Sequence, residues 1–264
     1  AAGYVYLCNY LFGYYSIILD LICTVGVIPL TYTAVFVYRY TIEDKEKRRV
    51  KKIFKHYVSE DVVEEILKYP GEIPLRGNRV GVSVLFADIR GFTSLSEELD
   101  PHRVVEILNS YFTVMVDIIL KHKGTLDKYI GDGILAYYGA PIVREEHADL
   151  AVSSAIEMVS KLDILNKEFT LDSPLRIGIG IHSGDVVAGN IGSMRKMEYT
   201  IIGDTVNTAA RVEGLTKEFK TNILITEDTF SGLRSKYTII PEKEITLRGK
   251  TKPIKLYRVE GGAF

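Results

Sequence analysis

The 264-residue sequence contains only two cysteines, Cys8 and Cys23, and both lie near its N-terminus. Because the rest of the chain has none, a disulfide framework or a cysteine-based metal site is excluded there. The formal net charge is −1, with 33 basic and 34 acidic residues. This balance gives no reason to expect a nucleic-acid partner. The length and the 47% hydrophobic content are sufficient for one good-sized domain and additional parts.

Charged residues are almost absent from residues 4–38, where Asp20 is the only one. The apolar run over residues 14–38 is about as long as a helix that spans a bilayer. Eight Lys and Arg against three acidic residues follow within residues 39–56, which is typical of the cytoplasmic side of a span. We therefore expect residues 1–40 to be the end of a transmembrane portion that anchors the protein in the cell membrane, with the rest in the cytoplasm.

A buried core helix is the alternative to a transmembrane helix, because Gly26 and Pro29 also interrupt the apolar run. A secretory signal peptide fits poorly, since the basic residues follow the run instead of preceding it. Residues 41–78 are predicted to form a helical linker, with Ser59 as an N-cap where the helix restarts. This linker either couples a membrane portion to a following domain or is a solvated helix.

Beyond residue 78 the hydrophobic pattern alternates between strands and helices. A continuous apolar, β-branched run indicates a buried central strand, and a long amphipathic segment indicates a helix. The predicted elements are a strand at 80–89, a helix at 101–124, a hairpin at 125–139, a helix at 145–169, two strands within 175–192 around Ser183, Gly184 and Asp185, and strands at 221–226 and 255–259. This order predicts an α+β fold with helices on one face of a sheet.

Two aspartates lie where predicted strands end. Asp88 ends the first buried strand, and Asp132 lies at the tip of the hairpin. A rigid sheet can present such side chains at a site, although a lone aspartate is more often a turn or cap residue. Two carboxylates suit a hard divalent cation that also binds substrate phosphates. The helix start at Phe92 and Thr93 offers free backbone N–H groups, which favour phosphate oxygens.

A second polar group lies further along the chain. Asn207 and Arg211 are four residues apart in a predicted helix and therefore share one face. The strand-like run before this helix contains Thr200, a polar residue among apolar ones. Asp204, which follows that run, is interpreted as a helix cap.

Several long motifs occur together in the part of the chain after residue 78. They are FADIRGFTSLSE, LDKYIGDGILAYYGAP, GIGIHSGDVVAGNIG and YTIIGDTVNTAARVE. In this order they resemble the catalytic domain of the class III nucleotidyl (adenylyl/guanylyl) cyclases, from about residue 79 to the C-terminus. The preceding FKHYVSEDVVEEIL resembles the segment that joins membrane sensor portions to bacterial cyclase domains.

The resemblance implies a ferredoxin-like βαββαβ core with additional strands and helices over residues 79–264, active as a head-to-tail homodimer with sites at the interface. Asp88 and Asp132 match the carboxylates that hold two Mg²⁺ or Mn²⁺ ions, with the backbone carbonyl of Ile89 as an additional ligand. Asn207 matches the residue that orients the ribose. Arg211 matches the one that stabilises charge on the α-phosphate from the other subunit.

The resemblance also implies a base pocket formed by Lys128 and Thr200. Lysine can only donate, so it matches adenine N1 and is opposed by guanine N1–H, while threonine can accept from the 6-amino group. Arg248 aligns with a basic residue that contacts the terminal phosphate, although an exposed arginine is usually just solvated. Threonine at position 200 resembles a class IIIb-like subgroup that includes bicarbonate-responsive enzymes, which implies regulation by bicarbonate.

The function implied is that of an adenylyl cyclase, which converts ATP to 3′,5′-cyclic AMP and pyrophosphate. The alternative is a catalytically inert nucleotide- or regulator-binding module of the same fold. Such modules typically lose a metal aspartate or the arginine, whereas this chain keeps every matched position. A diguanylate cyclase would need a Gly-Gly-acid-acid-Phe type loop, which the sequence lacks. The glycines at 178–192 do not fit a dinucleotide loop, and His182 is interpreted as structural.

Overall fold

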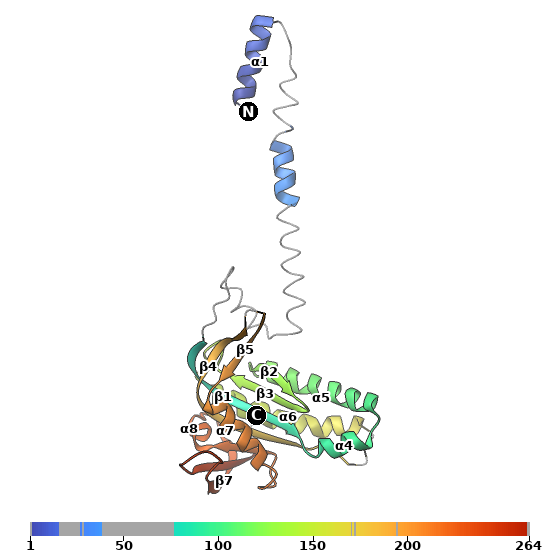
Figure 1. Ribbon diagram of the computed structural model, residues 1–264, viewed down its shortest axis with the longest axis vertical. Coiled ribbons are helices and arrows are strands. Elements are labelled where there is room, and N and C mark those ends of the chain that lie inside the picture. Colours follow the sequence, from blue (N-terminus) through green and yellow to red (C-terminus); the bar gives the residue numbers. More distant parts are fainter. Residues whose placement is uncertain are drawn as a thin grey trace. The chain divides into compact units, whose positions relative to one another are not determined.

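The computed structural model describes residues 2–15, 27, 29–38, 77–169, 171, 173–193 and 195–262 (Figure 1). The chain divides into two compact units, Ala1–Tyr57 and Val58–Phe264. In the first unit, α1 (Ala2–Tyr15) is a helix, and residues 29–38 are helical.

Within these described ranges, no helix is both long enough and apolar enough to cross a membrane. Residues 16–26 and 28 of the predicted span at 14–38 lie outside the described residues. The same holds for residues 41–76, which include Ser59 and nearly all of the predicted linker. Both assignments therefore stay predictions.

The described residues of the second unit form one eight-stranded sheet. Its strands follow the order β2-β3-β1-β4-β6-β8-β7, and β5 pairs with β4 off this path. The strands are β1 (Gly77–Ile89), β2 (Thr125–Ile130), β3 (Gly133–Tyr138), β4 (Ile177–Ser193), β5 (Lys196–Ile202), β6 (Ile223–Thr226), β7 (Tyr237–Ile245) and β8 (Ile254–Gly262). The helices are α4 (Phe92–Glu98), α5 (Pro101–Lys121), α6 (His147–Glu168), α7 (Asp204–Leu215) and α8 (Glu227–Ser231).

The core of this unit has the chain order β1-α5-β2-β3-α6-β4, with α4 as a short helix before α5. Its four strands lie in the order β2-β3-β1-β4, and each is antiparallel to its neighbours. This is the split βαβ arrangement of the ferredoxin-like fold, so the predicted α+β core is confirmed. The start of α5 follows from its sequence: Pro101 occupies the first turn, and the Asp100 side chain accepts from the backbone N–H of His102 at 2.9 Å.

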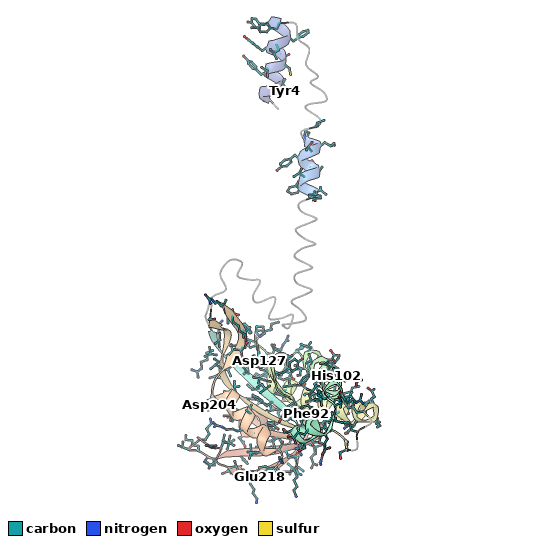
Figure 2. All side chains as sticks on the ribbon, turned by 45° about the vertical axis from the view of Figure 1, so that its right-hand side comes forward. Tyr4, Phe92, His102, Asp127, Asp204 and Glu218 are labelled. Carbon is teal, nitrogen blue, oxygen red and sulfur yellow. The ribbon has the colours of Figure 1, made fainter. Side chains whose placement is uncertain are left out.

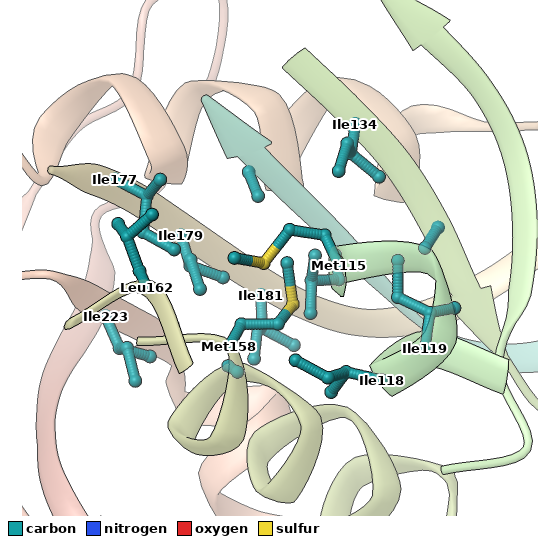
Figure 3. Close-up of a cluster of buried hydrophobic side chains, with 14 of the residues drawn as sticks. Met115, Ile118, Ile119, Ile134, Met158, Leu162, Ile177, Ile179, Ile181 and Ile223 are labelled. Atoms are coloured by element: carbon teal, nitrogen blue, oxygen red, sulfur yellow. The ribbon is translucent and has the colours of Figure 1, made fainter. Parts of the chain in front are cut away.

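Helices cover both faces of the sheet, so the prediction of helices on one face is wrong. On one face, side chains of α5 and α6 such as Met115 and Met158 pack against the isoleucines of β3, β4 and β6 (Figure 3). On the other face, Val82 and Val84 of β1 cluster with Ala209 of α7. The physical reason is that β1 is apolar on both faces, and a central strand of this kind needs cover on both sides.

The prediction of two strands within 175–192 is also wrong, because this segment is the single strand β4 of 17 residues. It pairs with β1 from Gly77↔Gly189 to Ile89↔Ile177 without interruption. The residues expected to turn lie inside this ladder, where the Ser183 hydroxyl is 2.6 Å from the hydroxyl of Ser83. Continuous pairing with a long central strand therefore overrides the local turn signal.

Candidate active site

The hairpin between β2 and β3 brings two aspartates together. Asp88 is the penultimate residue of β1, and Asp132 lies in the two-residue turn closed by the pair Ile130↔Gly133. Gly131 has a φ of 63°, a left-handed conformation that glycine adopts without strain. A Cβ atom on Gly133 would lie 3.2 Å from Oδ1 of Asp88. Both glycines thus allow the hairpin tip to approach Asp88 closely.

Asp88 and Asp132 form an acidic pair. Burial raises the pKa of Asp88 to about 6, together with the charge of Asp132 and a hydrogen bond between the two side chains, while a backbone hydrogen bond at Ile89 lowers it. In the described part of the chain, no group of three or more His, Cys, Asp or Glu side chains could hold a metal ion. Two carboxylates with an adjacent backbone oxygen nevertheless fit Mg²⁺, which takes its remaining ligands from water and substrate phosphates.

Two further side chains, Glu213 and Tyr111, lie near this pair, and Arg90 lies near Glu213; sequence reasoning missed all three. Glu213 of α7 has its pKa raised to about 7 by burial and then by the charge of Asp88. The hydroxyl of Tyr111 is buried without a hydrogen-bond partner among the described residues, and burial raises its pKa. Arg90 donates to the carbonyl of Thr216 at 3.2 Å and to that of Thr221. Their sequence context gives no signal of this proximity.

Lys128 and Thr200 meet at a carboxylate that the sequence did not single out. The hydroxyl of Thr200, on β5, donates to Oδ2 of Asp127 at 3.0 Å. Nζ of Lys128, on β2, lies 3.4 Å from the same oxygen and 3.0 Å from Oε2 of Glu198. Partial burial lowers the pKa of Lys128, but the hydrogen bond to Glu198 and the charge of Asp127 raise it overall. The structure thus brings the two predicted base-reading residues together.

Asp127 occupies an irregular position in β2. The pairing of β2 with β3 shifts register between Leu126 and Lys128, which marks a β-bulge at Asp127. Its side chain is 0% exposed, and Oδ1 has no hydrogen-bond partner among the described residues. Burial raises the pKa of this carboxyl, although the hydrogen bond from Thr200 and the charge of Lys128 oppose the shift.

The first turns of α7 carry a third set of predicted residues. Asn207 is exposed, and Arg211 is half-buried with Nη2 3.7 Å from where a Cβ of Gly249 would lie. Arg248 is exposed between β7 and β8, next to Gly249. Asp204 is not the helix cap that we expected, because Gly203 holds that position. Its carboxylate pairs with the ammonium of Lys250 instead.

The remaining predicted residues lie at or near the start of α4. Phe92 is partly buried and packs against the main hydrophobic core, whereas Thr93 is exposed. Among the described residues no side chain caps this helix start, so a role in binding would fall to its backbone N–H groups. His182 is held inside the fold by a contact of 2.8 Å between Nδ1 and the hydroxyl of Thr226, which agrees with a structural role. Figure 2 labels Phe92 at the start of α4, Asp127 on β2 and Asp204 at the start of α7.

Comparison with known proteins defines the family. Residues 78–261 match the model of the adenylate and guanylate cyclase catalytic domain. An adenylate cyclase of Anabaena cylindrica is 37% identical over 188 residues, covering 68% of this chain and 36% of the relative. Adenylate cyclase 1 of Rhizobium meliloti (strain 1021) is 30% identical over 185 residues, covering 69% and 28%. The chain belongs to the adenylate and guanylate cyclase catalytic domain family, and it spans about a third of the length of these curated relatives.

Solved structures support the same assignment. The adenylyl cyclase CyaB from P. aeruginosa matches with a TM-score of 0.67 and 34% identity, covering 72% of this chain and 98% of that one. The guanylyl cyclase Cya2 matches with a TM-score of 0.65 and 36% identity, covering 72% and 96%. Since cyclases of both specificities are similarly close, overall identity does not separate ATP from GTP as the substrate. That distinction depends on the residues that face the base.

Proposed function

We propose that this protein is an adenylyl cyclase, which forms 3′,5′-cyclic AMP and pyrophosphate from ATP at the interface of a homodimer. Membership of the cyclase family and the names of its relatives support this activity. The acidic pair Asp88 and Asp132 supports binding of two Mg²⁺ or Mn²⁺ ions. The proposal includes attachment to the cell membrane through the N-terminal segment, a cytoplasmic catalytic domain, and regulation by bicarbonate, all of which rest on the sequence.

The observation that carries the choice of ATP is the meeting of Lys128 and Thr200 at Asp127. Adenine presents an acceptor at N1 and a donor at its 6-amino group. An ammonium can only donate, and a hydroxyl can accept, so this pair is complementary to adenine. Guanine presents the opposite pattern and would leave buried polar groups unpaired.

The chain's own residues then have distinct tasks. Divalent ions bound at Asp88 and Asp132 would supply activation of the ribose 3′-hydroxyl and stabilise charge on the triphosphate. Asn207 holds the ribose in the orientation needed for attack on the α-phosphate. The guanidinium of Arg211 stabilises the charge that develops on that phosphate, a task for which its planar donor set is suited.

The distribution of these groups in one chain supports a dimer. The charge of Arg211 acts on Asp204, whereas the charge that acts on Asp88 is that of Asp132. Within one chain, Arg211 therefore faces Asp204 and not the acidic pair of Asp88 and Asp132. A second copy can bring its own Arg211 to that pair. Apolar side chains at Tyr129 and Ile202, which are 46% and 54% exposed, are candidates for burial in that interface.

The test is a turnover assay on the purified protein with ATP and GTP, each with Mg²⁺ and with Mn²⁺. Cyclic AMP should be the main product, and removal of divalent ions should abolish its formation. Preferential formation of cyclic GMP would refute the substrate. Absence of turnover from a folded dimer with either nucleotide would instead favour the inert module.

A further inference from the structure

We infer that Asp127 is a specificity-determining residue that orients the hydroxyl of Thr200, so that this hydroxyl presents only its lone pairs to the base. The inference rests on the proposed adenylyl cyclase function and adds a positioning residue to the proposed base pocket. It follows from the geometry around Asp127, which lies between the two residues that are proposed to face the base.

The β-bulge gives Asp127 its place in the pocket. In a regular strand, residues 127 and 128 would point to opposite faces of the sheet. The register shift between Leu126 and Lys128 removes this constraint, so that the ammonium of Lys128 and the hydroxyl of Thr200 both contact Oδ2 of Asp127. Bulges commonly redirect a side chain near an active site.

The protons in this cluster have a defined arrangement. The ammonium of Lys128, 3.4 Å from Oδ2, favours the ionised form of Asp127. An ionised carboxylate can only accept, and threonine has a single hydroxyl hydrogen. Because Thr200 donates that hydrogen to Oδ2 at 3.0 Å, its remaining capacity is to accept. Asp127 thus converts a hydroxyl that could serve either purine into an acceptor.

This arrangement determines which purine the position can bind. The 6-amino group of adenine donates to the lone pairs of Thr200. The O6 atom of guanine would bring its own lone pairs against them, and the hydroxyl hydrogen is not free to turn. The site then rejects guanine at this position as well as at Lys128.

The burial of Asp127 indicates that it does not serve stability. Its side chain is 0% exposed, and Oδ1 has no hydrogen-bond partner among the described residues. The hydroxyl of Tyr137 is also buried without such a partner. Burial, and next the charge of Asp127, raise the pKa of Tyr137. A buried carboxylate with one unpaired oxygen is costly to the fold, so a functional reason for it is expected.

The first experiment measures kcat/KM for ATP and GTP in Asp127→Asn. The asparagine NH₂ group can donate to Thr200 and leave its hydroxyl hydrogen free for guanine O6. The ratio of ATP to GTP efficiency should fall by about tenfold or more, while the melting temperature is unchanged or raised. An unchanged ratio in a folded variant would overturn the inference and leave the adenylyl cyclase assignment intact.

A double-mutant cycle separates the route through Thr200 from a direct effect on Lys128. In a Thr200→Val background there is no hydroxyl to orient, so Asp127→Asn should leave the ATP to GTP ratio within about twofold. The matched control is Glu198→Gln, which removes an exposed partner of Lys128 without touching Thr200. A fall in the ratio in the valine background, or an equal fall in Glu198→Gln, would show that Asp127 acts through Lys128 and would overturn the inference.

A second measurement uses the wild-type protein and does not depend on the folding of any variant. N6-methyl-ATP and the triphosphate of 6-methoxypurine riboside have similar size and the same acceptor at N1, but position 6 donates in the first and accepts in the second. An oriented Thr200 should favour N6-methyl-ATP by about tenfold. Equal efficiencies would overturn the inference, whereas a wild type that prefers GTP to ATP would overturn the proposed function itself.

Discussion

Arg211 and Glu213 are two positions apart on α7, and their side chains lie in different electrostatic environments. Glu213 lies near Asp88. Burial of Glu213, and next the charge of Asp88, raise the pKa of Glu213 to about 7. Arg211 lies beside Gly249, and its charge adds to the Lys250 hydrogen bond that lowers the pKa of Asp204. One helix therefore contributes Glu213 to the surroundings of the acidic pair on one side and places Arg211 near Gly249 and Asp204 on the other.

This relationship predicts that activity can be restored by mixing two inactive variants. Asp88→Ala and Arg211→Ala should each lose nearly all turnover, because each removes a group from both sites of a homodimer. A mixed dimer contains one site with both groups intact. Mixing at equal concentrations should therefore recover a measurable part of wild-type cyclic AMP formation, up to about a quarter if subunits exchange at random.

The control is a mixture of Asp88→Ala with Asp132→Ala, since each change removes one carboxylate of the same acidic pair. That mixture should stay inactive, because each site takes both Asp88 and Asp132 from one chain and each chain lacks one of them. Failure of the first mixture to recover, with subunit exchange demonstrated by differently labelled chains, would count against sites shared between two copies.

A second prediction concerns metal binding at the acidic pair. Asp88→Asn should reduce turnover by at least about a hundredfold, yet in EDTA its melting temperature should equal or exceed that of the wild type. The reason is that the substitution removes the repulsion between Asp88 and Asp132. Addition of Mn²⁺ should stabilise the wild type and have little effect on the variant. A variant that is stabilised by Mn²⁺ as strongly as the wild type would exclude Asp88 as a metal ligand.

A third prediction tests how α6 is tied to the segment before β7. Asp149 accepts from the backbone N–H groups of Arg234 at 3.0 Å and Ser235 at 2.8 Å. Burial alone would raise the pKa of Asp149, but these hydrogen bonds lower it overall. Its contribution to the free energy of unfolding is therefore present above the unfolded-state pKa of about 3.9 and is lost as the pH falls through the lower native value.

Asp149→Asn should accordingly lower the free energy of unfolding by about 1–3 kcal/mol at pH 7. The difference from the wild type should shrink as the pH falls below about 4. Urea denaturation across this pH range measures both effects, and Asp163→Asn, at an exposed position of the same helix, is the matched control. A loss of stability that is independent of pH would point to packing rather than to the charge of Asp149.

Periodicity in the sequence predicted most of the fold, because its signals are local. The buried strand at 80–89, the hairpin at Gly131 and Asp132, and the helices at 101–124 and 145–169 all follow from patterns within a few residues. β7 was missed: its exposed and half-buried residues lack a clear apolar alternation. The turn expected near Gly184 failed because a long-range partner, β1, holds β4 in one continuous ladder.

The candidate site shows the same division. Asp88 and Asp132 could be predicted because strand ends and turn residues are local features. Asp127 could not, since strand alternation places it on the face opposite Lys128, and only a bulge reverses that. Glu213 was missed because its proximity to Asp88 arises from how α7 packs across the sheet. Tertiary contacts between distant segments set these positions, and one sequence does not display them.

The last prediction concerns base selection by Lys128 and Thr200. Lys128→Glu should cost more ATP turnover than Thr200→Ala, because a carboxylate cannot donate to adenine N1 and brings its own lone pairs against that atom, whereas alanine only removes one acceptor. Combined with Thr200→Cys, Lys128→Glu should move the preference toward GTP. A glutamate at position 128 would lie beside both Asp127 and Glu198, so the double variant should be slow, and adding Glu198→Gln should raise its GTP turnover. Kinetics with both nucleotides measure this ratio, and an unchanged ATP to GTP preference in the double variant would refute the assignment of this pair to the base.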